Sequence, residues 1–122
     1  SAVSHLYMKS KLAIITVLVT IAIGLPVKAE DTRIKNRAQV VGALADAECL
    51  VKYGKLPKEK VYEMIRFYIN DHPQLIAAYS WALVSPKAKT LVKKLLPYQG
   101  FDCTGLMLSE EEADRLMLPY LK

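Results

Sequence analysis

Apolar residues recur along much of this chain at the three- and four-residue spacing of an α-helix. Between residues 61 and 69 they stand at positions i, i+3, i+4, i+7 and i+8, and a similar spacing returns between residues 88 and 96. No run alternates between polar and apolar residues, as a half-buried strand does. The pattern therefore predicts an all-α fold.

Helix-capping and helix-breaking residues divide the chain into four or five short helices. We expect Asp31 or Thr32 to cap the first helix, which runs to Tyr53. Gly54 suits the position just after its C-terminus, and Pro57 suits the first position of the next helix. The apolar residues of the first helix form two ridges, a stripe wide enough to pack against two neighbouring helices.

The segment 74–85 contains no charged residue, and its apolar side chains would cover every side of a helix. A helix that is apolar all round is usually buried. We therefore expect this segment, capped by Asp71, to form the central helix of the domain.

The remaining helices are delimited by serine and proline residues. Ser85 and Pro86 open a helix that ends before Pro97, and residues 98–108 form the only long irregular stretch. Ser109 followed by Glu112 is a capping box, which predicts the start of the last helix. Pro119 is expected to end its regular part.

An uncharged apolar run at residues 12–25 indicates export. It follows two lysines and precedes Val27-Lys28-Ala29, whose small residues suit a signal-peptidase site. We thus predict an upstream extension at 1–7, a signal peptide at 8–29 and one small helical domain at 30–122. The alternative is an uncleaved membrane anchor, although the run is shorter than the roughly 20 residues that a spanning helix needs.

Export changes how the net charge of +5 is interpreted. Three of the 17 basic residues would leave with the signal peptide, so 14 basic residues would face 12 acidic ones, a net charge of +2. A nucleic-acid or anionic-membrane partner requires a concentrated basic field. We expect no nucleic-acid partner, and membrane contact only through the signal segment before its cleavage; a protein partner remains open.

The predicted mature chain contains two cysteines, Cys49 and Cys103. In an oxidising compartment, an even number of cysteines in a small domain indicates a disulfide. We therefore predict one disulfide, which would connect the end of the first helix to the irregular segment 98–108, and a secreted or periplasmic location.

One polar cluster stands out on the first helix. Glu48 falls between the two apolar ridges, with Lys52 and Arg37 on the same side of the helical wheel. One interpretation is a surface ion pair between Glu48 and Lys52, which are four residues apart. The other is a partly buried polar site beside Cys49.

Other chemistry finds little support in the residue types. The only histidine of the mature chain, His72, lies in a turn, and the two cysteines do not form a CxxC motif. A carboxylate-only site for a hard ion, around Asp46 and Glu48 or Asp102, is conceivable. Our expectation is nevertheless that the chain has no metal site and no cofactor, and that the aromatic residues 62–81 are core.

Three short blocks resemble a group of exported bacterial proteins of unknown function. They are residues 45–51 (ADAECLV), 101–103 (FDC) and 109–113 (SEEEA), together with the closing Pro119-Tyr120-Leu121. Some members of that group are named class-II cyclic-AMP phosphodiesterases, which implies a metal-dependent hydrolase. The histidine-rich H-x-H-x-D-H motif of those enzymes is absent from this sequence, so no catalytic residue transfers.

These observations favour an exported, non-enzymatic interaction or binding module. The first alternative is a cyclic-nucleotide phosphodiesterase, on the basis of the resemblance alone. The second is a periplasmic chaperone or apolar-ligand carrier, similar to the small all-helical acid-stress chaperones that carry one disulfide.

Overall fold

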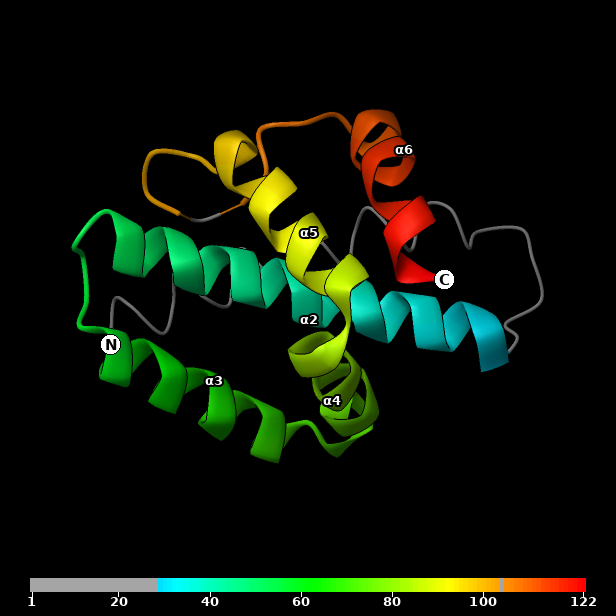
Figure 1. The fold of residues 1–122 in the computed structure, drawn as a ribbon, viewed down its shortest axis with the longest axis horizontal. Coiled ribbons are helices and arrows are strands. Elements are labelled where there is room, and N and C mark those ends of the chain that lie inside the picture. The colour runs from blue at the N-terminus through cyan, green and yellow to red at the C-terminus, as the bar shows by residue number, and fades with distance from the viewer. Residues whose placement is uncertain (1–28, 104) are drawn as a thin grey trace.

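The structure is a computed structural model that describes residues 29–103 and 105–122; the predicted upstream extension and residues 8–28 of the predicted signal peptide lie outside them. All of its regular elements are helices (Figure 1). The irregular loop between η2 and α6 contains one isolated β-bridge, between Gln99 and Leu106. This confirms the prediction of a single small all-α domain. Its elements are α2 (Ala29–Lys52), α3 (Lys58–Asp71), η1 (Pro73–Leu75), α4 (Ile76–Val84), α5 (Pro86–Leu95), η2 (Leu96–Tyr98) and α6 (Glu110–Leu121).

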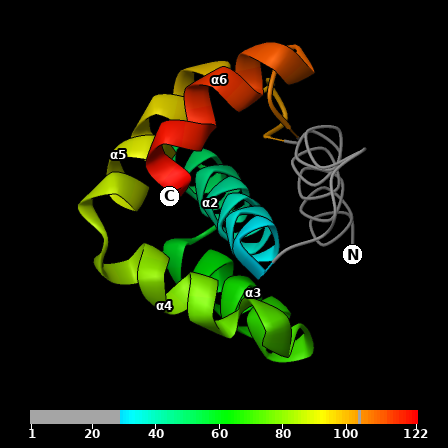
Figure 2. The same cartoon turned by 90° about the vertical axis from the view of Figure 1, so that its right-hand side faces the viewer.

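The first described helix, α2, is the centre of the domain. The α3 and α4 helices lie on one side of it, and α5 and α6 lie on the other (Figures 1 and 2). Between Ala38 and Leu50 only Glu48 is exposed. Small residues allow neighbouring backbones to approach closely on several sides of α2. They are Ala38, Gly42, Ala43, Ala45 and Ala47.

The prediction that segment 74–85 forms the central helix is wrong. Only Ala78 and Ala82 of α4 are buried, whereas Val84 is 75 % exposed and Leu83 is 51 % exposed. The α4 helix contacts α2, α3 and α5, yet its outer residues Ile76, Leu83 and Val84 remain open to solvent. The longer helix α2, whose side chains are smaller, occupies the centre instead.

The periodic apolar faces of α3 and α5 are confirmed. Both helices turn these faces toward the core, and Ser85 caps α5 by accepting a hydrogen bond from the Ala88 backbone N–H. The buried residues are Val61, Ile65, Tyr68 and Ile69 on α3 and Ala88, Leu91, Val92 and Leu95 on α5.

Three predicted helix starts differ from the structure. Pro57, predicted as the first residue of its helix, is instead the N-cap of α3, which begins at Lys58. The α2 helix already begins at Ala29, so neither Asp31 nor Thr32 is its cap. Asp71 belongs to α3, and no side chain caps the turn η1 that follows it. Asp31, Thr32 and Asp71 lie inside helices here, and aspartate and threonine are tolerated at helical positions as well as at caps.

The C-terminal helix α6 keeps its predicted start and extends past its predicted end. The Ser109 hydroxyl accepts a hydrogen bond from the Glu112 backbone N–H, and the Glu112 carboxylate accepts one from the Ser109 N–H, which confirms the capping box. Pro119, however, lies inside the helix. The final turn persists because Leu121 is fully buried in the core.

A disulfide joins Cys49 of α2 to Cys103 in the loop before α6, with 5.7 Å between the Cα atoms. This confirms the predicted pair. Backbone hydrogen bonds from Gly100 to Gly105 and from Met107 to Tyr98 close the loop further. The disulfide thus anchors the longest irregular stretch of the domain to the central helix.

Candidate binding groove

The structure separates the residues of the predicted polar cluster. Glu48 is exposed near the C-terminal end of α2, and Arg37 lies eleven positions earlier, about 16 Å along the helix axis. Within the described part of the chain, Glu48 and Lys52 form no ion pair. The Lys52 ammonium lies instead 5.8 Å from the centroid of the Tyr53 ring.

Arg37 takes part in tertiary packing at the other end of the domain. Its guanidinium donates a hydrogen bond to the Leu121 carbonyl at 3.0 Å and lies 4.3 Å from the centroid of the Trp81 ring. Burial, and secondarily the charge of Arg33, lowers the pKa of Arg37 from its usual value. These contacts connect α2 to α4 and α6 and leave Arg37 remote from Glu48.

Among the described residues, no three His, Cys, Asp or Glu side chains come close enough to hold a metal ion. Asp46 is only 1 % exposed whereas Glu48 is exposed, so these two carboxylates do not face a common space. The His72 ring stacks on Tyr68, with 4.2 Å between the ring centroids, and its Nδ1 lies 2.9 Å from the Tyr68 carbonyl oxygen. His72 therefore helps to close the turn after α3.

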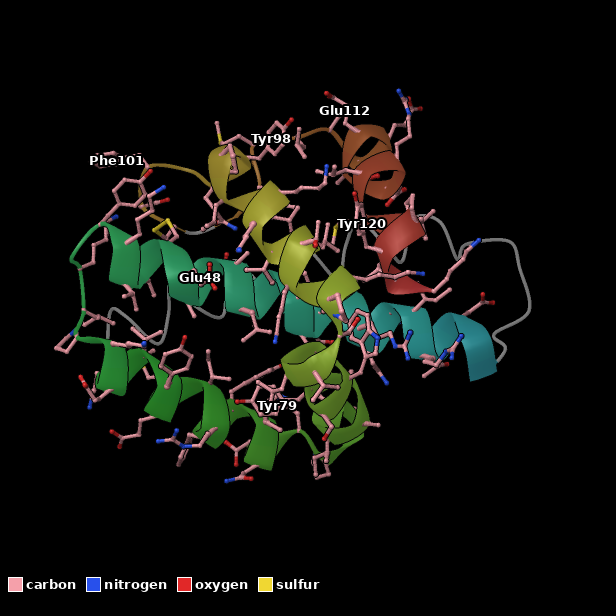
Figure 3. The ribbon with its side chains drawn as sticks, viewed as in Figure 1. Glu48, Tyr79, Tyr98, Phe101, Glu112 and Tyr120 are labelled. Carbon is pink, nitrogen blue, oxygen red and sulfur yellow. A yellow bond between two sulfur atoms is a disulfide. The ribbon has the colours of Figure 1, made fainter. Side chains whose placement is uncertain are left out.

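Glu48 does lie beside a different feature, an open groove of about 300 Å³ over the C-terminal half of α2. The helices α3 and α5 both pack against α2 and α4 (Figure 1) but not closely against each other, and the groove is lined by residues of all four helices. Figure 3 shows Glu48 on the stretch of α2 that runs between them. The groove is lined by Leu44, Ala47, Glu48, Tyr62, Ala82, Leu83, Lys89, Val92 and Lys93.

The floor of the groove is apolar and partly open to solvent. Leu83 of α4 is 51 % exposed and Tyr62 of α3 is 37 % exposed, while Ala47 and Ala82 close the bottom. Alanine at these two positions matters, because a larger side chain would fill the space. The result is a concave apolar surface of the kind that binds ligands or partner side chains.

The rim of the groove is charged. Lys89 and Lys93, one helical turn apart on α5, line the groove on the side of that helix, and Glu48 of α2 also lines it. All three side chains are exposed. The lining therefore carries two positive charges and one negative charge around an apolar floor.

The expectation that the aromatic residues 62–81 are core is only partly correct. Tyr68 is buried and Tyr79 and Trp81 are half-buried, but Phe67 is 71 % exposed and Tyr62 opens onto the groove. Elsewhere, Phe101 in the loop before α6 is 96 % exposed (Figure 3). The Lys55 ammonium, 5.1 Å from that ring, also donates a hydrogen bond to the Phe101 carbonyl.

The sequence contained a signal for the groove. Segment 74–85 has more apolar residues than a nine-residue helix can bury, so some of them must lie at the surface. The location of that surface depends on how α3 and α5 diverge over α2. The angle between α3 and α5 is a property of the tertiary structure.

Comparison of the chain with family models, with curated proteins and with solved structures finds no match. In the part of the chain that the structure describes, no helix combines the length and the apolar character needed to cross a membrane. The disulfide is typical of an oxidising compartment. A function for this domain is therefore inferred from its geometry.

Proposed function

We propose that this domain is an exported, non-enzymatic binding module that holds the apolar part of a partner protein in the groove between α3 and α5. The observation that carries the proposal is the concave apolar floor, with Leu83 half exposed at its edge. Exposed large apolar side chains in a concave surface mark binding sites more often than isolated exposed ones do.

The shape of the groove favours a helical partner. A groove between two helices accepts an amphipathic helix, whose apolar residues at i, i+3 or i+4 and i+7 enter it from one side. The apolar lining residues Leu44, Leu83 and Val92 come from three different helices, so a bound helix would contact α2, α4 and α5 together. On this model the partner helix would lie on α2, flanked by α3 and α5.

The charges on the rim favour an acidic side on that partner. Lys89 and Lys93 would pair with acidic residues one turn apart, and Glu48 would face a basic or neutral residue. Such rim charges contribute mainly to orientation and association rate, and the apolar floor supplies most of the affinity.

Export is the second part of the proposal. It is supported by the apolar segment 12–25 with its adjacent cleavage pattern and by the disulfide. N-terminal sequencing of the protein from its own cells should find Glu30 as the first residue. A product that retains residues 12–25 would indicate a membrane anchor instead.

A fluorescent dye tests whether the groove binds apolar groups. We expect anilinonaphthalene sulfonate, which combines fused rings with one anion, to gain emission on binding the folded protein at neutral pH. Leu83→Glu places a carboxylate in the groove and should weaken binding roughly tenfold or more. Val84→Glu is the matched control, because Val84 is 75 % exposed but does not line the groove.

The outcome separates a preformed binding groove from a chaperone. Equal loss of binding in both variants, or no binding, would contradict the proposed groove. Dye binding that appears only on acidification would favour a chaperone, which must expose apolar surface on demand.

Site-specific crosslinking identifies the class of partner. A photoreactive amino acid at position 83 should yield a defined protein adduct in the native compartment, and the same group at position 84 should yield much less. The double variant Lys89→Gln/Lys93→Gln should reduce the adduct, while Lys87→Gln/Lys94→Gln, with the same change in charge on α5, should not. An adduct with a small molecule alone would favour a carrier of apolar ligands.

A further inference from the structure

A second hollow lies at the opposite end of α2 from the groove. It measures about 270 Å³ and lies between the first turns of α2 on one side and η1 with the first turn of α4 on the other. Its lining residues are Thr32, Arg33, Asn36, Arg37, Gln74, Ala77 and Ala78. Among the described lining residues, none is shared with the groove of the proposed function, so the two sites are spatially separate.

The lining of this hollow is basic. Arg33 and Arg37 stand one helical turn apart on α2, and none of the described residues that line the hollow is acidic. Like charges at this spacing destabilise a helix. The repulsion between the two guanidiniums contributes to the lowered pKa of Arg37, although burial contributes more. A bound anion would relieve this repulsion.

The fold constrains the two arginines to different degrees. Arg37 is held in place by the Leu121 carbonyl and the Trp81 ring, so its guanidinium is oriented before any ligand arrives. One of its five N–H groups is used on the carbonyl, and others remain available. Arg33 is exposed and is free to close over a ligand from the outer side.

The other lining residues supply neutral polar groups and a small apolar wall. The Asn36 amide donates a hydrogen bond to the Gln74 carbonyl at 3.3 Å, which holds η1 against α2. The exposed side chains of Thr32 and Gln74 provide further hydrogen-bond donors at the edge, and Ala77 and Ala78 form an apolar wall.

From this arrangement we propose that the hollow at Arg33 and Arg37 binds a small organic anion. The paired guanidiniums would hold a carboxylate or phosphate group in the bidentate manner that arginine favours, and a short apolar body would lie on Ala77 and Ala78. A volume of about 270 Å³ suits a ligand with one ring or a short chain and a single anionic group.

The test is an NMR titration of the full exported domain with phenyl phosphate and, separately, with benzoate, at an ionic strength held constant with sodium chloride. We expect saturable shifts of the backbone amides of Arg33, Gln74 and Ala77, and an increase in Tm with each ligand that binds. A response to phenyl phosphate alone, or to benzoate alone, would identify the anionic group for which the site is built.

Matched variants connect the response to the arginine pair. Arg33→Gln removes one guanidinium from an exposed position and should weaken binding at least several-fold while leaving the free protein folded. Lys35→Gln removes the same charge from a residue of α2 that does not line the hollow, and should keep the response. The absence of saturable shifts with both ligands, or equal shifts in Arg33→Gln and the parent protein, would overturn the proposal.

Discussion

The guanidinium of Arg37 donates a hydrogen bond to the backbone carbonyl of Leu121 at 3.0 Å, across 84 positions of sequence. Leu121 is the last residue of α6 and is fully buried. The carbonyls of a last helical turn have no partner within their own helix. Arg37 of the central helix α2 provides a partner for the Leu121 carbonyl. Its guanidinium also stacks on Trp81 of α4, so α2, α4 and α6 meet at this junction.

We expect Arg37→Gln to destabilise the domain by about 1–3 kcal/mol, because a charged hydrogen bond and a cation–π contact are both lost. Urea unfolding at neutral pH measures the change. Arg66→Gln, at an exposed position of α3, is the control and should change stability by less than about 0.5 kcal/mol. Equal effects of the two substitutions would show that the junction contributes nothing specific.

The disulfide is expected to account for a large part of the stability. Cys49 and Cys103 are separated by 54 positions, and the chain-entropy model assigns about 4 kcal/mol to a loop of that size. Reduction, or the double substitution to alanine, should lower the urea midpoint strongly and free the loop before α6. Thiol counting of the unreduced, denatured protein should find no free thiol; two free thiols would contradict the bond.

Asp114 of α6 should produce an unusual dependence of stability on pH. Burial, followed by the neighbouring charge of Glu110, raises the pKa of Asp114 above its ordinary value of 3.8. Its Oδ1 is buried without a hydrogen-bond partner in the described structure. The folded protein therefore takes up this proton at a higher pH than the unfolded chain does.

The sign of the effect follows from that difference. As pH falls from the raised pKa toward 3.8, this group contributes increasing stability to the folded state, and at neutral pH it is unfavourable. Asp114→Asn should remove this pH-dependent contribution and stabilise the protein slightly at neutral pH. The measurement is the difference in unfolding free energy between variant and parent across the acidic range, with the exposed Asp71→Asn as control. A difference that does not vary with pH would contradict the assignment.

Removal of the capping box of α6 is expected to lower the stability of the domain. Ser109→Ala removes the acceptor for the Glu112 backbone N–H and should cost about 1 kcal/mol. Ser80→Ala, in the middle of α4 and exposed, should be neutral or slightly stabilising because alanine favours helix interiors. Thermal unfolding of both variants gives the comparison, and a loss at Ser80 as large as the loss at Ser109 would argue against the cap.

We expect no metal-dependent hydrolysis of cyclic nucleotides by the purified domain. Metal-assisted hydrolysis requires several ligands around one ion, and the described carboxylates and His72 are dispersed over the fold. Assays with added Mg²⁺, Mn²⁺ or Zn²⁺ test this expectation. Turnover that disappears in Glu48→Gln or His72→Ala, with the fold intact, would establish an enzyme in place of a binding module.

Features that depend on residues close in sequence were predictable. The spacing of Val61, Ile65 and Ile69 encodes the inward face of α3, and the Ser109 capping box encodes the start of α6. Both arise from interactions within one or two helical turns, which do not depend on how the helices pack. The Cys49–Cys103 pair was predictable for another reason, since the predicted mature chain offers no other partner for either cysteine.

Features that depend on how helices meet were not predictable. The apolar composition of segment 74–85 indicated that it forms the central helix. The small residues of α2, however, allow four neighbouring helices to approach it, so α2 is the most buried helix instead. Arg37 shares a wheel position with Glu48, yet its partners Trp81 and Leu121 are brought to it by α4 and α6. Only the tertiary structure decides which side chains remain exposed, because that depends on the angles and distances between helices, to which residues far apart in sequence contribute together.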